Sequence, residues 1–151
     1  MNLLNFFFLN LIAIDSYDLL SRFKETKMSR YHEYHRKEFG NDGNYSQLQN
    51  DCTHTLDTNN SFWMVNLGRE YHVHSVVIYA SIQDPFYRFV GTEVELLDKN
   101  DEVVHNCETI KEYRPYYYIS CLFVGVYKVR IRQPKDMMLI LCEVDVFGNV
   151  Y

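Results

Sequence analysis

The stretch that decides the fold is YKVRIR, residues 127–132, in which apolar and basic side chains alternate. Successive side chains of a β-strand point to opposite faces of the sheet, so Tyr127, Val129 and Ile131 share one face while the three basic residues share the other. This alternation is typical of a strand that buries one face and exposes the other. The segment therefore predicts a half-buried β-strand.

Similar segments occupy most of the chain beyond residue 40. They are short, rich in β-branched and aromatic residues, and separated by turn signals such as Leu67-Gly68-Arg69 and Arg114-Pro115. The segments are residues 62–67, 71–79, 92–97, 116–122 and 139–147. None shows a helical period. We expect an all-β protein, folded as an antiparallel β-sandwich.

Length and charge narrow the class of protein. The chain has 151 residues, of which 47% are hydrophobic, and this size suits one domain with a real core. Its 15 basic and 20 acidic residues give a net charge of −5, whereas proteins that bind duplex nucleic acid normally carry a basic excess. We expect no nucleic-acid partner.

The N-terminus differs from the rest of the chain. Residues 3–14 are largely apolar, but a helix of that length spans about 18 Å, short of the ~30 Å hydrocarbon core of a bilayer. The stretch suits the apolar region of a signal peptide, although no Lys or Arg precedes it and no clean cleavage site follows. We expect residues 1–16 to be a signal peptide or a leader outside the domain, and residues 17–151 to form the domain. A signal peptide would make the chain secreted and its four cysteines oxidised.

Enzyme motifs are missing from the sequence. There is no nucleophile elbow, phosphate loop or dinucleotide-binding glycine pattern. His32 and His35 in HEYH lie three residues apart, whereas the zinc-protease motif needs four, and no third ligand is evident. We expect this segment to be a polar surface segment. His72 and His74 share a face of a predicted strand and are expected to be exposed. We therefore predict a protein that is not an enzyme.

The turn Asp42-Gly43-Asn44 offers oxygen atoms, which hard cations such as calcium prefer. A plain turn has the same letters, and a metal site would need a carboxylate from elsewhere in the chain. Glu143 could supply one if Cys142 were bridged to Cys52.

Four pieces of the sequence together resemble the F-type lectin (fucolectin) domain of the discoidin-like group. They are DGN at 42–44, CTH at 52–54, FWMVNLG at 62–68 and LCEVDVFG at 141–148, in the family's order. The resemblance spans residues 22–148. It implies a β-jelly roll of the galactose-binding type that binds calcium and, in many members, fucose.

The family's sugar motif is H-x26-R-x-D-x4-R, which aligns with His54, Ser81, Gln83 and Arg88. The resemblance implies a carbohydrate site lined by these residues, with the first Arg and the Asp of the motif replaced. Losing one charged hydrogen bond costs about 1.5–3 kcal/mol, so we expect a specificity that departs from fucose.

The resemblance also implies a structural calcium ion. Its ligands would be side-chain oxygens of Asp42 and Asn44, main-chain oxygens of Asp51 and Cys142, and the carboxylate of Glu143. All five positions can offer oxygen, the ligand atom that calcium takes.

By the same resemblance, the cysteines pair as Cys52–Cys142 and Cys107–Cys121. The family often carries two adjacent cysteines after the motif Asp. Asp84 and Pro85 stand there in this chain, which accounts for two bridges rather than three.

The first hypothesis is therefore a secreted, calcium-containing carbohydrate-binding module. Its partners would be glycans or glycoproteins, among them fucosylated ones, and it would meet membranes only through surface glycans or lipid. Oligomers are compatible with the sequence. The alternative is a discoidin-like protein- or lipid-binding module that uses Phe86, Tyr87 and Phe89 as apolar anchors around Arg88.

Overall fold

The computed structural model describes residues 16–56 and 59–150. The predicted leader, residues 1–16, lies outside the described part except for its last residue, so the structure leaves that prediction untested. Within the described ranges, no helix is both long and apolar enough to cross a membrane.

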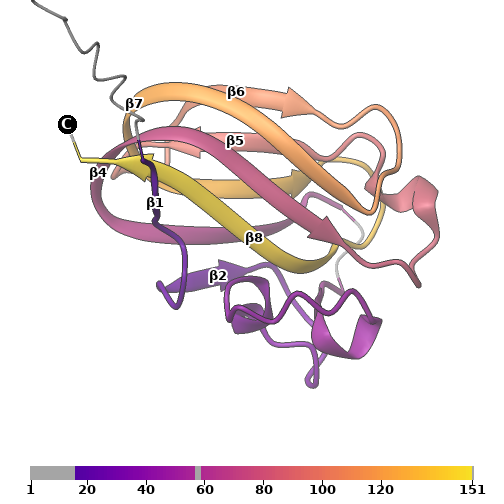
Figure 1. Ribbon diagram of the computed structural model, residues 1–151. Helices are drawn as coiled ribbons and strands as arrows, with labels where there is room; N and C mark the ends of the chain where they lie inside the picture. The colour runs from indigo at the N-terminus through magenta and orange to yellow at the C-terminus, as the bar shows by residue number, and fades with distance from the viewer. Residues whose placement is uncertain (1–15, 57–58, 151) are drawn as a thin grey trace, which may run out of the picture.

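The described chain is built from strands and three short 3-10 helices (Figure 1). The helices are η1 (Lys37–Gly40), η2 (Gln49–Asp51) and η3 (Phe86–Phe89). The strands are β1 (Asp18–Leu19), β2 (Thr26–Met28), β3 (Thr53–His54), β4 (Ser61–Ala80), β5 (Glu93–Leu97), β6 (Val103–Thr109), β7 (Tyr116–Gln133) and β8 (Ile140–Asn149). The predicted all-β class is confirmed.

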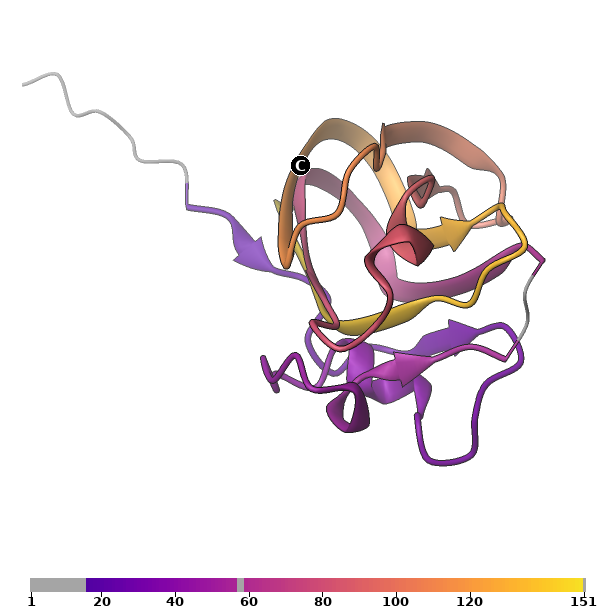
Figure 2. The same cartoon turned by 90° about the vertical axis from the view of Figure 1, so that its right-hand side faces the viewer.

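The strands pair in the order β1-β8-β4-β7-β5-β6, with β2 added to β4 and β3 added to β8, and every pairing is antiparallel. The long strands β4 and β7 curve so that the sheet folds over on itself, which produces the layers of a sandwich (Figures 1 and 2). The segment with β2, η1 and η2 packs beside β8.

The curved strands correct one detail of the sequence prediction. Residues 62–67 and 71–79 were expected to be separate strands around a turn, but both lie in β4, and residues 116–122 and 127–132 both lie in β7. Register shifts occur in this part of the β4–β7 pairing, and Gly68 and Gly125 have φ values of 86° and 87° there. A β-bulge bends a strand without ending its pairing, so glycines that look like turn signals mark bends instead.

The alternating stretch behaves as its pattern indicates. Val129 and Ile131 are fully buried in the core. On the other face, Arg130 and Arg132 form ion pairs with Glu95 of the neighbouring β5, at 2.6 and 3.1 Å. The basic face is therefore matched by acidic residues across the strands.

A buried tryptophan positions the loop that follows η1. The indole Nε1 of Trp63 donates a hydrogen bond to the carbonyl of Lys37, at 2.8 Å. A Cβ atom at Gly40 would lie 2.6 Å from the Trp63 ring, so only glycine allows η1 to pack this closely. Residues 41–46 are consequently held against β8.

Both predicted disulfides are confirmed. Cys52–Cys142 links the start of β3 to β8 across 90 residues, and Cys107–Cys121 links β6 to β7 across 14. The first bridge fixes the strand that carries His54 beside the strand that carries Glu143.

Candidate functional site

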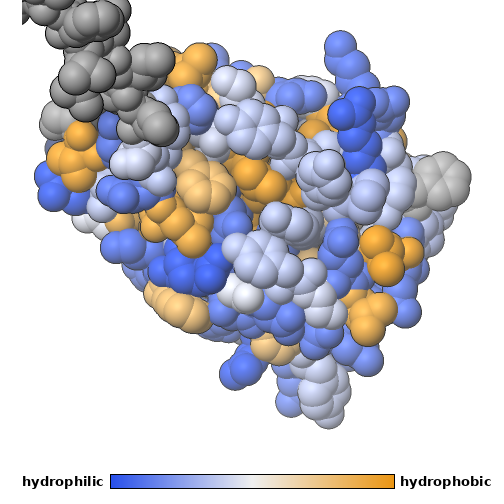
Figure 3. Space-filling view, viewed as in Figure 1, coloured by the Kyte–Doolittle hydropathy of each residue, from blue (hydrophilic) through white to orange (hydrophobic). Residues whose placement is uncertain are grey.

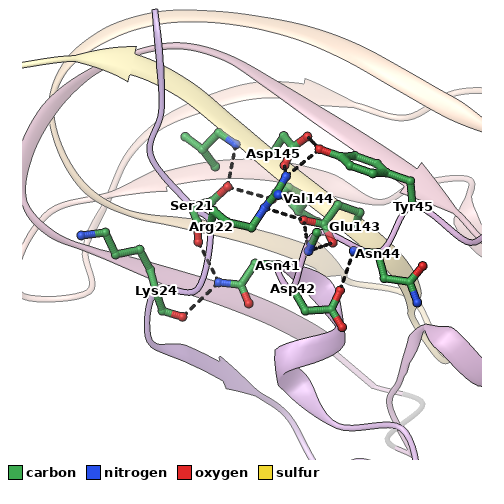
Figure 4. Close-up of polar contacts among 12 residues, drawn as sticks. Ser21, Arg22, Lys24, Asn41, Asp42, Asn44, Tyr45, Glu143, Val144 and Asp145 are labelled. Carbon is green, nitrogen blue, oxygen red and sulfur yellow. Dashed lines mark hydrogen bonds and ion pairs between the residues drawn. The ribbon is translucent and has the colours of Figure 1, made fainter.

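The first candidate region lies where the 41–46 loop meets β8 (Figure 4). The carboxylate of Glu143 is fully buried, and both its oxygens accept from the backbone N–H of Gly43, at 3.1 and 3.3 Å. Arg22 Nε lies 3.5 Å from Glu143, and its Nη2 lies 3.2 Å from Asp145, which also accepts from the hydroxyl of Tyr45 at 2.7 Å. Burial raises the pKa of Glu143 to about 8. We call this network the loop–β8 network.

The predicted calcium ligands adjoin this network. Asp42 Oδ1 accepts from the N–H of Asn44, and Asn44 Oδ1 accepts from the N–H of Ser46, so both side chains fold back over the loop. The charge of Asp42 contributes to the raised pKa of Glu143, which places the two carboxylates near each other. Asp51, in η2, accepts from the hydroxyl of Ser46 at 2.6 Å.

The oxygen atoms of the predicted calcium ligands are of the kind that a hard cation prefers. Each oxygen named above has a second lone pair beyond the hydrogen bond it accepts, and Cys142 offers its main-chain carbonyl beside Glu143. Gly43 is required here, because its φ is +84° and an added Cβ would lie 2.5 Å from Arg22 Nη1.

The second candidate region is centred on His54, at the end of β3. Burial, together with the nearby charges of His35, His32 and Arg88, lowers the pKa of His54 to about 4. The ring is therefore neutral at pH 7. Arg88 is therefore close enough for its charge to act on the His54 ring.

The hydrogen bonds of His54 indicate its tautomer. The side-chain amide of Gln49 lies 3.4 Å from His54 Nδ1, and an amide NH₂ group can only donate. The proton of the neutral ring is then on Nε2, which is buried and has no hydrogen-bond partner among the described residues. An unsatisfied buried donor is rare in folded proteins and marks a place where a ligand can contribute the missing acceptor.

Arg88 is held in place by a residue that the motif count missed. Its Nη1 donates to Asp84 Oδ1 at 3.0 Å, and the Asp84 side chain is only 10% exposed. Burial raises the pKa of Asp84, while Arg88 opposes the shift. The motif count aligns the acidic position with Gln83, and the residue after it, Asp84, carries the carboxylate that pairs with Arg88. The i,i+4 spacing of Asp84 and Arg88 was the signal that could have found the pair.

The two replaced motif positions have different surroundings. Ser81 is 1% exposed, and its hydroxyl accepts from the N–H of Gln83 and faces the carbonyl of Gln47. Gln83 is exposed and accepts from the N–H of Gln49, at 2.8 Å. Both residues thus contact residues 47–49, the segment that contains Gln49, whose amide lies beside His54 Nδ1.

The HEYH segment lies on the surface as expected, but it also contacts His54. A β-bridge between Tyr31 and Thr55 brings the segment alongside β3, and the N–H of His32 donates to the carbonyl of His54 at 3.1 Å. The ring centroid of His54 lies 5.3 Å from that of His35 and 6.4 Å from that of His32. No local sequence signal predicts this long-range pairing.

Other predicted residues need correction. His72 and His74 are half-buried rather than exposed, and His74 stacks on Tyr17 at 3.8 Å. Phe89 is not a surface anchor, because it is 4% exposed and stacks on Tyr117 in the core. Tyr87 is 53% exposed, whereas the side chain of Phe86 lies outside the described part.

The face in Figure 3 carries its apolar residues in separate small groups among hydrophilic ones.

Known proteins share this architecture. The lectin-binding domain of Lectinolysin, solved as a His 62 mutant with Lewis b, is 22% identical over 88% of this chain and 97% of its own, with a TM-score of 0.81. The fucose-binding module SpX-3 of Streptococcus pneumoniae is 23% identical over 85% and 96% of the two chains, with a TM-score of 0.79.

The fucolectin from Morone saxatilis (striped bass) serum is 25% identical over 88% of this chain, with a TM-score of 0.79, and this chain spans 48% of its length. These likenesses confirm the predicted jelly-roll sandwich. No curated protein sequence matches the chain significantly. The family model for the NedA-like, galactose-binding domain matches residues 40–131, more than half of the sequence. The chain therefore belongs to the NedA-like galactose-binding domain family.

Proposed function

We propose that this chain is a non-catalytic carbohydrate-binding module that binds a terminal sugar of a glycan at His54 and Arg88. The observation that carries the proposal is the buried Nε2–H of His54, which has no hydrogen-bond partner among the described residues and belongs to a ring on which the charge of Arg88 acts. Both groups donate hydrogen bonds, as recognition of sugar hydroxyl and ring oxygens requires. Two of the solved relatives, a Lectinolysin domain in complex with Lewis b and a fucose-binding module, add support for a glycan ligand.

Within this proposal, Asp84 sets the direction in which Arg88 donates. The Asp84 carboxylate occupies Nη1, so the remaining donors of the guanidinium fork stay free for a ligand. Ser81 offers no second guanidinium. Binding of a fucose-type sugar should therefore be weaker by about 10- to 100-fold than with a second arginine, the equivalent of one charged hydrogen bond.

We also propose a structural calcium ion held by Asp42, Asn44, Asp51, Cys142 and Glu143. When bound, it would supply positive charge that fixes the 42–51 segment against β8. The chain itself contributes the Gly43–Glu143 hydrogen bonds and the Cys52–Cys142 bridge, which bring the two sides together. The two disulfides and the source of the striped-bass relative, serum, support an extracellular location.

A glycan array probed with and without a calcium chelator tests the function. We expect a restricted set of glycans that bind the chain and are lost in His54→Ala. The matched control is His105→Gln, because His105 is also half-buried but stacks on Phe123 and lies in β6, at the far end of the strand order. The proposal fails if no glycan binds or if both variants bind alike. Binding to liposomes that no sugar competes away would favour the lipid-binding alternative.

The calcium proposal has its own test. Added calcium should raise the melting temperature of the chain, and Glu143→Gln should remove that response. An unchanged melting curve with calcium would refute a structural calcium ion and leave the carbohydrate proposal intact.

A further inference from the structure

The HEYH segment has no role in the proposed function, yet it places two imidazole rings beside a third. His32, His35 and His54 form a closed triangle, with ring centroids 5.6, 5.3 and 6.4 Å apart for the pairs 32–35, 35–54 and 32–54. We propose that these three histidines bind one transition-metal ion such as Zn²⁺.

The spacing of the rings is close to that of a three-histidine site. With a zinc–nitrogen distance of about 2.0–2.1 Å and roughly 1.1 Å from nitrogen to ring centre, tetrahedral geometry places imidazole centroids about 5.2 Å apart. Two of the observed separations lie within half an ångström of this value, and the 32–54 pair must close by about 1 Å. As the side chains stand, no three His, Cys, Asp or Glu residues in the described ranges converge on a metal. His32 is exposed, so its ring can turn to complete the set.

The hydrogen bonds orient the rings as metal ligands are oriented. His35 Nδ1 lies 3.1 Å from the carbonyl of Cys52, which can only accept, so the proton is on Nδ1 and the lone pair is on Nε2. Metal-binding histidines typically donate their other ring N–H to a carbonyl in this way. The free nitrogen of His35 therefore has the form that a metal requires.

His54 supplies the second observation that points to a ligand. Its Nε2 is buried and unpartnered in the described structure. Metal binding uses the other tautomer of this ring: with the Gln49 amide turned over, its oxygen accepts from Nδ1–H and the Nε2 lone pair is available, a form that excludes the Nε2–H donor of the proposed sugar site.

The backbone around the triangle is already fixed. The N–H of His32 donates to the carbonyl of His54, and that of His35 donates to the carbonyl of His32. The positive charge of Arg88, which would repel a cation, is paired with Asp84. Metal binding would therefore require little further ordering of the main chain.

One consequence rests on the proposed function. Because His54 Nε2 is also the proposed sugar-binding donor, a bound metal ion and a glycan would compete for it. Metal binding itself does not depend on that proposal and is measured without any sugar.

The test titrates ZnCl₂ into the full chain, without a polyhistidine tag, by isothermal calorimetry. We expect one Zn²⁺ per chain, with shifts of the ring signals of all three histidines in NMR spectra. His35→Ala and His54→Ala should each weaken zinc binding at least tenfold, on the order of the loss for a disrupted metal site, whereas His105→Gln should not. Mg²⁺ should leave the ring signals unchanged, because it prefers oxygen ligands.

Variants that fail to fold are recognised from their melting curves in the absence of metal. His35→Gln then replaces His35→Ala, since its amide can still donate to the carbonyl of Cys52. Zinc binding that is absent, or unchanged in the His35→Ala/His54→Ala double variant, would overturn the inference. Zinc binding that persists in a chain that binds no glycan would support the metal site and overturn only the proposed carbohydrate function.

Discussion

The loop–β8 network and the His54 region are adjacent, yet they differ in how their buried polar atoms are partnered. In the network, both oxygens of buried Glu143 accept from the one N–H of Gly43, and Arg22 Nε lies 3.5 Å from Glu143 without a hydrogen-bond partner among the described residues. In the His54 region, a buried ring nitrogen has no hydrogen-bond partner in the part of the chain that the structure describes, and the half-buried guanidinium of Arg88 pairs with Asp84 through Nη1. Satisfied polar groups stabilise a fold, whereas unsatisfied ones cost stability and persist where a ligand can complete them. The unpartnered nitrogen of Arg22 lies beside the Glu143 carboxylate, whereas His54 Nε2 has no such counterpart among the described residues, so the His54 region is the better candidate for sugar binding.

The largest expected effect comes from the bridge that joins the two regions. Cys52→Ala/Cys142→Ala should lower the free energy of unfolding by about 4 kcal/mol, because the closed loop is long. Cys107→Ala/Cys121→Ala should cost about 3 kcal/mol and leave both regions intact. Urea denaturation measures both. Equal effects on glycan binding in the two double variants would show that the Cys52 bridge has no special role in the site.

Gly43, in the loop–β8 network, and Gly68, in β4, have nearly the same φ but different surroundings. Gly43→Ala should destabilise the chain by about 2 kcal/mol, because a side chain is strained at φ +84° and the new Cβ, 2.5 Å from Arg22 Nη1, would move the end of Arg22 away from Glu143 and Asp145. Gly68→Ala has φ +86° with open space around it, so it should cost only about 1 kcal/mol of backbone strain. The difference between their urea midpoints isolates the contact with Arg22. A Gly43→Ala variant no less stable than Gly68→Ala would show that the loop yields without cost.

Acid should destabilise the His54 region. The pKa of His54 in the folded chain, about 4, lies below the ordinary histidine value of 6.5, so protonation favours the unfolded chain. The stability that depends on this neutral ring is complete above pH 6.5 and is lost as the pH falls towards 4. The change should be on the order of 1–2 kcal/mol, because solvent screens a half-buried ring. Melting temperatures across that range should fall less steeply in His54→Gln, and parallel curves for the two proteins would contradict the assignment.

How much the sequence could predict depends on how local each signal is. The alternation at residues 127–132 is local, and it correctly predicted a half-buried strand. The cysteine pairing followed from motif order, which records a long-range contact indirectly. The sequence predicts a turn at Gly68, where the structure has a bend, because a glycine alone does not distinguish a bulge from a chain reversal. The contact of His32 with His54 depends on backbone pairing between distant segments, so no spacing rule could have found it.

The smallest effect tests how Arg88 is positioned. Asp84→Ala should weaken glycan binding about fivefold to tenfold, because the guanidinium would lose its 3.0 Å partner and its fixed direction. Asp84→Asn keeps a hydrogen-bonding oxygen and should lose less. Asp136→Ala, an exposed aspartate in the β7–β8 connection, is the matched control and should bind as the parent chain does. Titration with the best glycan from the array measures all three variants. If Asp84→Ala bound that glycan like the parent, Arg88 would be positioned by the η3 backbone alone. The His54 region would then rely on a preformed turn rather than on an ion pair.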